Sequence, residues 1–481
     1  MSAASTAEYD LIILGGGAVG ENIADRAVQG GLTALIVENE LVGGECSYWA
    51  CMPSKALLRS AQALRAARQL PGAAEAITGQ LNVEAVLARR DYYTSNWSDA
   101  GQVQWLNSAG IGLIRGHGRI TGTKKVTVTA ADGSTTELTA RHAVAVATGS
   151  AAFLPDIEGL DAARPWTSRE ATSIKTVPAS LAIIGGGVVA TEIATAFAGF
   201  GTTVTLIARS GLLSGMEPFA GELVAAALRE QGVTLLLDTK TSSVHRGSTG
   251  VTIETSDGQT ITAQEVLIAT GRTPNTRDIG LDTVGLKPGD WIETDDTLQV
   301  PGLDWLYAAG DVTNRALLTH QGKYQARAAG DVTAARATGA DVMDAPWGRH
   351  VATADHAAVP QVTFTDPEIA SVGLTAQAAA RAGYDIRVVD YEIGHVAGAG
   401  LHAEGYKGTA RMVVDEARKV ILGMTFVGPD VSELLHAATI AIVSEVPLNR
   451  LWHAVPAYPT VSEIWLRLLE TYGRPAQQPS A

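Results

Sequence analysis

Cysteine is almost absent from this chain: it occurs twice among 481 residues, as Cys46 and Cys51. A structural zinc site needs four ligands, and neither a third cysteine nor a histidine pair at ligand spacing accompanies these two. Residues five apart rise ~7.5 Å along an ideal helix, so a bond between the two sulfurs requires an irregular helix start. A tight, distorted disulfide is easily reduced. The segment therefore favours a redox pair over two inert thiols or half of a zinc site.

An excess of basic residues and long apolar runs are also lacking. Lys and Arg total 36 against 50 Asp and Glu, and the net charge of -14 argues against a nucleic-acid partner. No apolar run reaches membrane-spanning length, and residues 1–10 lack the basic and apolar regions of a secretory signal. In a reducing compartment a disulfide is more often catalytic than structural. We therefore expect a cytoplasmic protein with no membrane partner and a catalytic cysteine pair.

Glycine, in contrast, is abundant, with 51 residues, and it marks an internal repeat. Two apolar runs each open into spaced small residues and continue as an Ala-rich stretch and a second apolar run. Strand, tight turn, helix and strand make the βαβ unit of a dinucleotide-binding fold. Two such units predict an enzyme that passes electrons between two cofactors. The motif positions are Gly15, Gly17 and Gly20 in the first copy and Gly185, Gly187 and Ala190 in the second.

The residue after the second strand of each copy indicates which nucleotide is bound. Glu38 ends that strand in the first copy and is placed to accept hydrogen bonds from an adenosine ribose. The same interval in the second copy leads to Ala208, which Arg209 follows. Loss of the carboxylate removes repulsion toward a 2′-phosphate, and a guanidinium supplies a bidentate partner. The pattern favours NADPH over NADH, with a solvated surface role for Arg209 as the alternative.

The rest of the chain predicts the domain organisation. A hairpin is expected over 126–138, and from about residue 351 alternating apolar runs and two helical runs indicate an antiparallel sheet with helices. We therefore predict an α/β protein with two Rossmann-like dinucleotide-binding domains and a C-terminal α+β domain. The expected bounds are 1–150 with 278–350 for the first domain, 151–277 for the second, 351–475 for the third and 476–481 for a disordered tail.

These motifs carry a family resemblance, together with Leu306–Val312, which contains a Gly-Asp pair, and Val362–Gly373, which contains Phe-Thr-Asp-Pro-Glu. Over almost its whole length the chain resembles the FAD-dependent pyridine nucleotide–disulfide oxidoreductases, such as dihydrolipoyl dehydrogenase, glutathione reductase and mercuric reductase. The resemblance implies FAD in the first domain and NADPH, or alternatively NADH, in the second. It also implies a homodimer formed through the C-terminal dimerisation domain, whose end completes the partner's active site.

The resemblance implies roles for individual residues as well. Cys51 would lie against the flavin and Cys46 would attack the substrate. Lys55 would lie near the flavin N5, and Glu192 would neighbour the nicotinamide. Asp311 would bind the flavin ribitol. The other cofactor-binding residues that it implies are His320 as a positioning residue, Gly44, Thr148, Gly149 and Gly271.

Two segments depart from the family pattern. Disulfide reductases carry His-Pro-Thr-x-x-Glu near the C-terminus, and their histidine protonates the departing thiolate. Here Tyr458 replaces the histidine while Glu463 is retained. A phenol ionises at about pH 10, so it is a poor base at neutral pH. His453 is an alternative base, but the turn at Pro456 favours a packing or surface role for it.

The second departure lies between the cysteines, where Tyr48 and Ala50 replace the usual Asn and Gly and Glu45 replaces Thr. Tyr48 and Trp49 are expected to pack beneath the following helix, or alternatively to narrow access to Cys46. The predicted function is reduction of a small disulfide or similar acceptor by NAD(P)H through FAD and the dithiol. One alternative is a flavin-mediated reductase of a quinone, a metal ion or a second nicotinamide. The other is a non-catalytic flavin-binding redox sensor.

Overall fold

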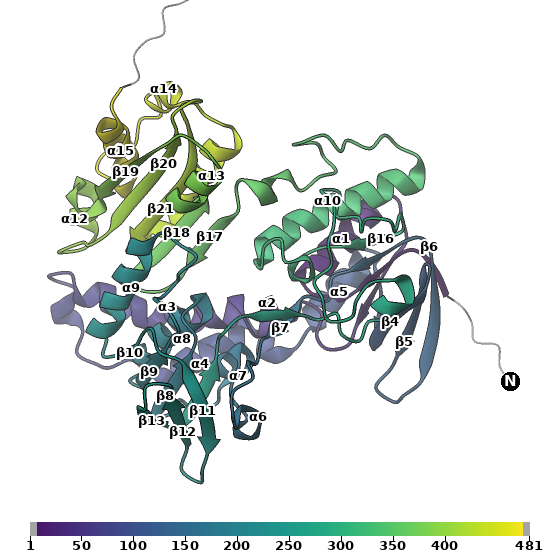
Figure 1. Cartoon of the computed structure of the whole chain (residues 1–481), viewed down its shortest axis with the longest axis horizontal. Coiled ribbons are helices and arrows are strands. Elements are labelled where there is room, and N and C mark those ends of the chain that lie inside the picture. Colours follow the sequence, from purple (N-terminus) through teal and green to yellow (C-terminus); the bar gives the residue numbers. More distant parts are fainter. Residues whose placement is uncertain (1–6, 475–481) are drawn as a thin grey trace, which may run out of the picture. The chain divides into compact units, whose positions relative to one another are not determined.

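The computed structural model describes residues 7–474, and the chain divides into two compact units (Figure 1). Unit 1 comprises Met1–Pro53, Arg89–Phe153 and Gly271–Asp355, and unit 2 comprises Ser54–Ala88, Leu154–Thr270 and His356–Ala481. The tail expected at 476–481 lies outside the described residues. Among the described residues, no helix is long and apolar enough to cross a membrane.

Unit 1 is built on a seven-stranded sheet in the order β3-β2-β1-β6-β5-β4, with β16 paired to β6. Its strands are β1 (Ala7–Leu14), β2 (Ala34–Glu38), β3 (Gly112–Arg115), β4 (His117–Gly122), β5 (Lys125–Thr129), β6 (Thr135–Val146) and β16 (Leu306–Ala308). The pairs of β1 with β2 and β6 are parallel, whereas β4, β5 and the start of β6 form an antiparallel meander. The hairpin predicted over 126–138 is therefore confirmed.

Close helix packing covers this sheet. The apolar residues 11–14 of β1 are all almost completely buried, as expected for a parallel strand that is covered on both faces. The helices α1 (Ala18–Gln29) and α10 (Thr319–Thr338) lie side by side (Figure 1). A Cβ at Gly330 would lie 2.6 Å from the Cβ of Arg26, so only glycine permits this approach of α10 to α1.

The nucleotide-binding part of unit 2 repeats the βαβ arrangement, as the sequence repeat predicts. Its parallel sheet has the order β10-β9-β8-β14, and a three-stranded antiparallel sheet, β11-β12-β13, accompanies it. These elements are β8 (Ser180–Ile184), α8 (Val188–Gly199), β9 (Thr203–Ile207), α9 (Pro218–Glu230), β10 (Thr234–Leu236), β11 (Thr241–Arg246), β12 (Val251–Thr255), β13 (Thr260–Ala263) and β14 (Glu265–Ile268).

The C-terminal part of unit 2 is the expected antiparallel sheet with helices. The strand order is β17-β18-β21-β20-β19. Strand β18 is not predicted from the sequence, because its residues lie in the stretch 362–373, which is interpreted only as a family signature. The elements are β17 (Pro360–Thr363), β18 (Glu368–Gly373), α11 (Ala376–Arg381), β19 (Ile386–Glu392), α12 (Ala397–His402), β20 (Thr409–Asp415), β21 (Val420–Gly428), α13 (Leu435–Val443), α14 (Leu448–Leu451) and α15 (Ile464–Tyr472).

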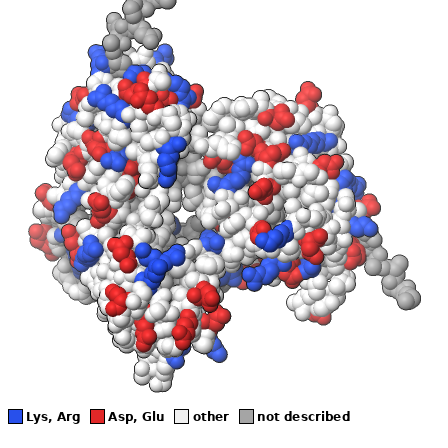
Figure 2. Space-filling view, viewed as in Figure 1, with Lys and Arg blue, Asp and Glu red and all other residues white. Residues whose placement is uncertain are grey.

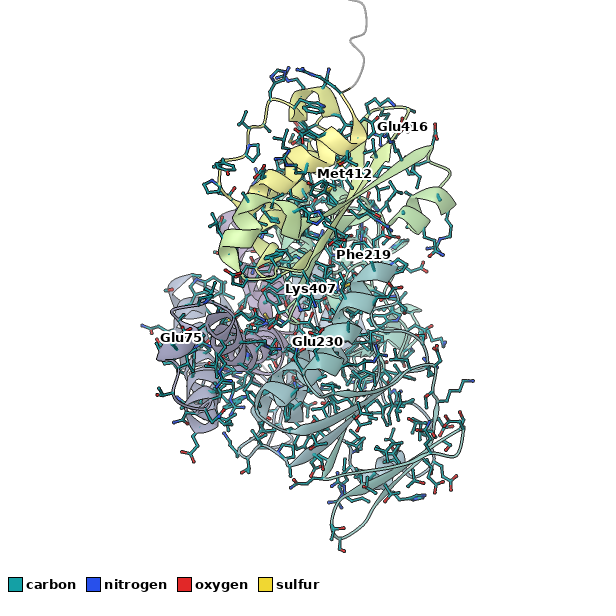
Figure 3. The ribbon with its side chains drawn as sticks, turned by 90° about the vertical axis from the view of Figure 1, so that its left-hand side faces the viewer. Glu75, Phe219, Glu230, Lys407, Met412 and Glu416 are labelled. Atoms are coloured by element: carbon teal, nitrogen blue, oxygen red, sulfur yellow. The ribbon has the colours of Figure 1, made fainter. Side chains whose placement is uncertain are left out.

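Contacts between α9 and the C-terminal sheet join the two parts of unit 2 (Figure 3). Arg411 of β20 forms an ion pair of 2.8 Å with Glu217, which is 2% exposed, and its guanidinium lies 5.1 Å from the ring centroid of Phe219. Lys407 lies 3.8 Å from Glu230 at the other end of α9. The Arg411 contacts are partly buried and so position α9, whereas an exposed pair such as Lys407 with Glu230 contributes little.

The remaining elements connect these sheets. They are α2 (Gly44–Tyr48), α3 (Cys51–Arg68), α4 (Val83–Tyr93), α5 (Ala100–Ser108), β7 (Ser150–Ala152), α6 (Leu160–Ala163), α7 (Ser168–Ser173) and β15 (Arg272–Pro274). Acidic and basic side chains are interspersed on the face shown in Figure 2, where no continuous basic surface is seen.

Candidate functional site

The two glycine motifs have the same local geometry. Gly15 has φ +102° and a Cβ there would lie 2.4 Å from the carbonyl oxygen of Ala147. Gly185 has φ +138° and a Cβ there would lie 2.1 Å from the carbonyl oxygen of Ala269. Each turn therefore excludes a side chain for two independent reasons, the positive φ and the close backbone. Gly20 permits the following helix to pack, since a Cβ there would lie 1.9 Å from the Gly15 oxygen.

The starts of α1 and α8 are suited to an anionic ligand. Their N-cap residues, Gly17 and Gly187, provide no side-chain cap, so the first N–H groups of each helix are left for another acceptor. Apart from its chain neighbours, no heavy atom of residues 7–474 lies within 4 Å of a Cβ built at Gly187. Thr148, beside the first motif, has a buried Oγ1 with no hydrogen-bond partner among the described residues. These features fit a dinucleotide such as FAD at the first motif and a second nucleotide at the other.

The strand-end residues of the two copies are structurally equivalent. A Cβ at Gly16 would lie 3.2 Å from the Cβ of Glu38, and a Cβ at Gly186 would lie 3.1 Å from the Cβ of Ala208. Glu38 is 8% exposed and accepts the Gly16 N–H at 2.6 Å, and burial raises the pKa of its carboxyl group. Ala208 is buried, and Arg209 beside it is exposed to solvent. The interval counted in the sequence therefore identifies the equivalent positions correctly.

The cysteines lie on either side of a break between two helices. Cys46 belongs to α2, which ends at Tyr48, and Cys51 is the first residue of α3. This is the irregular helix start that the spacing requires. Both cysteines are reduced thiols, and the Cys46 thiol is hydrogen-bonded to the Cys51 sulfur. That hydrogen bond, burial and the Cys51 charge raise the pKa of Cys46 well above its ordinary value.

Two helix N-termini meet at the Cys51 sulfur. The first is that of α3, and the second is that of α10, whose first residue, Thr319, has its Oγ1 3.3 Å from the Cys51 Sγ. The positive end of each helix dipole favours a thiolate there. Sequence reasoning missed Thr319. The adjacent His320, which is expected to position the flavin, is exposed on the first turn of α10. Only the fold brings α10 to the cysteines, 268 residues away in sequence.

Asp311 is oriented by the ribbon formed by β7 and β15. Ser150 donates a hydrogen bond of 2.6 Å to its carboxylate, and Arg272 donates to Ser150 at 2.5 Å. Nearby, Gly149 has φ +70° and Gly271 accepts the N–H of Phe153. Gly44 packs against the first glycine motif, since a Cβ there would lie 2.9 Å from the Cα of Gly17.

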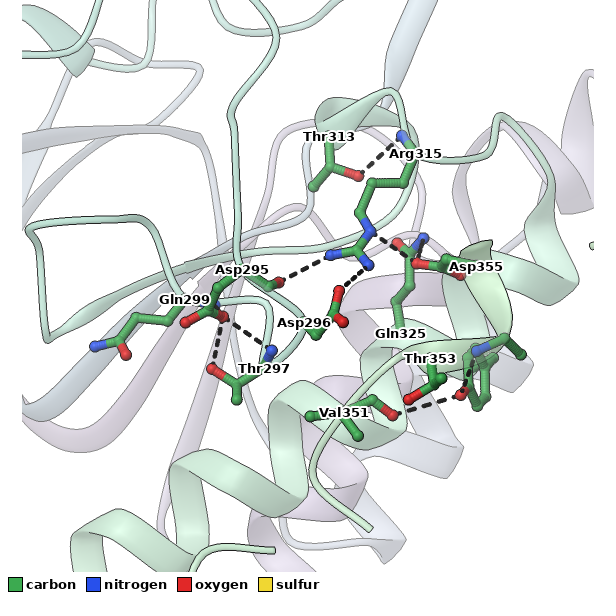
Figure 4. Close-up of polar contacts among 12 residues, drawn as sticks. Asp295, Asp296, Thr297, Gln299, Thr313, Arg315, Gln325, Val351, Thr353 and Asp355 are labelled. Atoms are coloured by element: carbon green, nitrogen blue, oxygen red, sulfur yellow. Dashed lines mark hydrogen bonds and ion pairs between the residues drawn. The ribbon is translucent and has the colours of Figure 1, made fainter. Parts of the chain in front are cut away.

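A buried carboxylate that the sequence did not reveal supports the Gly-Asp motif (Figure 4). The N–H of Gly310 donates to Gln325 at 2.8 Å, and Gln325 in turn donates to Asp355 at 2.9 Å. Arg315 forms an ion pair of 2.9 Å with the same carboxylate, whose side chain is 2% exposed. This network fixes the loop before α10 relative to the helix, and thereby the position of Asp311.

Unit 2 holds Glu192, which is predicted to neighbour the nicotinamide, and Lys55, which is predicted to lie near the flavin N5. Lys55, one turn after Cys51 on α3, forms an ion pair of 2.7 Å with Glu192, whose side chain is 5% exposed. Glu192 also accepts the N–H of Phe364 at 2.9 Å, and the Lys55 Nζ lies 4.9 Å from the Phe364 ring centroid. The buried carboxylate is thus paired and hydrogen-bonded, as a buried charge requires. Unit 2 also contains Gly185, Gly187, Ala190 and Arg209.

The C-terminal departure from the family pattern lies in unit 2 as well. Tyr458 is 76% exposed, and His453 is also exposed. Glu463 is only 6% exposed, and its Oε1 accepts a hydrogen bond of 2.5 Å from Arg467. Its other oxygen, Oε2, is buried and has no partner among the residues the structure describes. A carboxylate oxygen is therefore available at the position where the family pattern places a histidine partner.

Comparisons with known proteins agree with this geometry. Residues 9–338 match the model of the pyridine nucleotide-disulphide oxidoreductases, and residues 359–468 match their dimerisation domain. The chain is 31% identical to mercuric reductase from Staphylococcus aureus, over 95% of the chain and 81% of that protein. It is also 31% identical to dihydrolipoyl dehydrogenase from Chlorobaculum tepidum, over 95% of each.

The fold also matches a solved structure, the Cu(II) complex of the HOCl-induced flavoprotein disulfide reductase RclA from Escherichia coli. The TM-score is 0.82 at 22% identity, covering 97% of this chain and 99% of that one. The predicted fold class is confirmed: two dinucleotide-binding regions precede a C-terminal dimerisation domain. The chain belongs to the pyridine nucleotide-disulphide oxidoreductase family, whose members are FAD-dependent flavoproteins that use nicotinamide nucleotides.

Proposed function

We propose that this protein is an NADPH-dependent reductase in which electrons leave through Cys46 and Cys51 toward a small disulfide or similar acceptor. The observation that carries the proposal is the asymmetry of the pair. The Cys46 thiol donates to Cys51, and Cys51 lies at the N-termini of α3 and α10. One sulfur is thus poised as a thiolate, and the other is left to attack the acceptor disulfide, which forms a mixed disulfide and releases one thiol. The Cys51 thiolate then attacks Cys46, which releases the second thiol and re-forms the Cys46–Cys51 disulfide.

Each proposed role follows from an environment described above. The helix N-termini at Gly17 and Gly187 would bind the pyrophosphates, Glu38 the adenosine ribose of FAD, and Asp311 the ribitol. Bound FAD supplies hydride acceptance and delivery of an electron pair to a disulfide. Thr319 holds charge on Cys51, and the ion pair with Glu192 fixes the Lys55 ammonium one turn along α3. In a homodimer, the C-terminal segment of each dimerisation domain would complete the active site of the partner subunit.

The test is alkylation by N-ethylmaleimide with and without NADPH, followed by a turnover assay with 5,5′-dithiobis(2-nitrobenzoate), a small aryl disulfide. As isolated in air, the disulfide form has no thiol to alkylate, so activity should survive. Prior reduction by NADPH should expose both thiols, and alkylation should then abolish turnover. Inactivation that is equal in both arms, or turnover that survives alkylation of both cysteines, would argue for electron exit from the flavin.

NADPH preference makes a separate prediction. Ala208→Glu restores the carboxylate that the first copy carries at Glu38, and should repel a 2′-phosphate. Because hydrogen bonds to charged groups contribute ~1.5–3 kcal/mol, the ratio of kcat/KM for NADPH over NADH should fall about 10- to 100-fold. Arg209→Gln should weaken NADPH use and leave the KM for NADH unchanged. Steady-state kinetics with both nucleotides checks this, and an unchanged ratio in both variants contradicts the assignment.

A further inference from the structure

The break between α2 and α3 defines a short segment, residues 43–51, which we term the redox loop. At Trp49 the backbone leaves helical geometry, with φ -135° and ψ -3°, and the N–H groups of Trp49 and Ala50 both turn back to the Glu45 carbonyl. Carbonyls in the last turn of a helix lack intrahelical partners and need other donors. The Tyr48 carbonyl is one of these groups, so the stability of the break depends on the hydrogen-bond donor that the carbonyl finds.

An indole satisfies the Tyr48 carbonyl. The Nε1–H of Trp97 donates to the Tyr48 oxygen at 3.1 Å. The guanidinium of Arg90, which is completely buried, lies 5.1 Å from the centroid of the Trp97 ring. The cation–π contact on its face and the hydrogen bond at its edge give the indole a single orientation. Trp97 is therefore positioned to act on the redox loop without touching either sulfur.

The segment that carries Trp97 is itself strained. Ser95, Asn96 and Trp97 have φ of +50°, +51° and +56°, a left-handed conformation that residues with side chains rarely adopt. Consecutive residues of this kind persist where tertiary contacts hold them, and they concentrate at functional sites. Here the contacts are the indole hydrogen bond and the carboxylate of Asp99, which accepts the N–H of Val42 at 2.8 Å. Residues 94–99, the brace segment, thus hold the redox loop at both ends.

The buried side chain of Tyr48 also supports the redox loop. Its side chain is 1% exposed, and its hydroxyl donates to the Val42 carbonyl at 3.1 Å. Burial raises the pKa of Tyr48 to about 12, so the phenol stays protonated at neutral pH. Of the two expectations for Tyr48, packing beneath the following helix or narrowing access to Cys46, its burial agrees with a packing role. Tyr48 is a packing residue, and the geometry of the break depends on its carbonyl.

We propose that Trp97 is a positioning residue for the Cys46–Cys51 couple, holding the helix break that lets the two sulfurs bond. This inference rests on the proposed function, because it requires a reversible disulfide. If the indole N–H is lost, the Tyr48 carbonyl loses its donor and the break between α2 and α3 is no longer held in one geometry. Pro53 in the first turn of α3 keeps the two helices from fusing, so the expected change is a shift of Cys46 and Cys51 out of the narrow geometry that a disulfide requires. The oxidised form is then disfavoured and the equilibrium shifts toward the dithiol.

The test compares Trp97→Phe, which removes the N–H, with Trp97→His, which keeps a ring N–H. Each holoenzyme is equilibrated in dithiothreitol buffers, where disulfide and reduced dithiothreitol give two protein thiols and oxidised dithiothreitol. Thiols are then trapped with a maleimide after an acid quench. Because the chain has only two cysteines, the count reports this pair alone. Trp97→Phe should shift the equilibrium at least about tenfold toward the dithiol, which is ~30 mV.

Two controls make the result specific. Trp97→His should lie within about threefold of the wild type. Tyr48→Phe loses the hydroxyl bond to Val42 but keeps the carbonyl, so its equilibrium should also stay near the wild-type value. An unshifted Trp97→Phe, or equal shifts in both Trp97 variants, overturns the proposal. Failure of both Trp97 variants to fold also overturns the proposal, because an N–H that only positions the redox loop should not be required for folding of the whole protein. A wild type that never forms the disulfide instead contradicts the proposed function.

Discussion

Cys46→Ser should lower turnover of 5,5′-dithiobis(2-nitrobenzoate) by at least about 10³-fold, because it removes the attacking sulfur. The remaining sulfur, Cys51, hydrogen-bonds Thr319 at the N-termini of two helices, so it should not replace Cys46 as the nucleophile. NADPH oxidation with a quinone such as menadione, which takes electrons from the flavin, should change by less than about twofold. The measurement is steady-state kinetics with both acceptors at matched flavin content.

Cys51→Ser is the matched control, since it removes the other half of the pair and leaves Cys46 in place. It should also abolish aryl disulfide turnover, and its residual thiol should become more reactive toward N-ethylmaleimide at neutral pH. The reason is that Cys46 loses the hydrogen bond to the Cys51 sulfur and the neighbouring charge, both of which raise its pKa. Full aryl disulfide turnover in Cys46→Ser would show that the dithiol is not the exit route and would favour the flavin-mediated alternative.

The second large effect is a gain of activity. Tyr458→His should raise kcat/KM for an alkyl disulfide about 10²- to 10⁴-fold at neutral pH, the usual contribution of a general acid–base. An imidazole ionises at about pH 6.5, whereas a phenol does so at about pH 10. If the C-terminal segment completes the partner's active site as proposed, the imidazole could accept the proton of the Cys46 thiol there, whose raised pKa leaves little thiolate at pH 7, and return it to the departing thiolate. The unpartnered Glu463 Oε2 is available to orient the ring.

The pH profile distinguishes this explanation from a change in packing. Wild-type turnover should keep rising through the alkaline range, because more Cys46 thiolate forms as pH rises toward its elevated pKa. In Tyr458→His the rise should instead level off just above the imidazole pKa, about 7. Tyr458→Phe should match the wild type, and adding Glu463→Gln to Tyr458→His should remove most of the gain. Identical profiles for the histidine and phenylalanine variants would refute the account.

Some parts of this protein could be predicted from the sequence because they depend on local or periodic features. The glycine turns require a positive φ and close backbone contact at Gly15 and Gly185, which few other residues allow. The cysteine spacing requires a helix break wherever the two sulfurs meet. The interval from Gly15 to Glu38 identifies Ala208 in the second copy because both βαβ units have the same length and geometry. Each of these features is encoded within about 25 residues of sequence.

Other parts could not be predicted, because they join residues that are far apart in the chain. Thr319 reaches Cys51 only when α10 packs against α1, and nothing near it in sequence indicates a thiol partner. In the sequence Asp355 has no feature that distinguishes it from an exposed loop carboxylate, and its hydrogen bond with Gln325 is seen only in the folded structure. Trp97 resembles any half-buried indole. Strand β18 was missed because its motif was interpreted only as a family signature.

The most direct test of the central claim is an anaerobic titration of the oxidised enzyme with one equivalent of NADPH, with flavin absorbance and thiol count measured together. If the pair receives electrons through the flavin, two thiols per chain should appear while the flavin absorbance returns to its oxidised level. The count is unambiguous because the chain contains only Cys46 and Cys51. A flavin that stays bleached while no thiol appears would contradict the account.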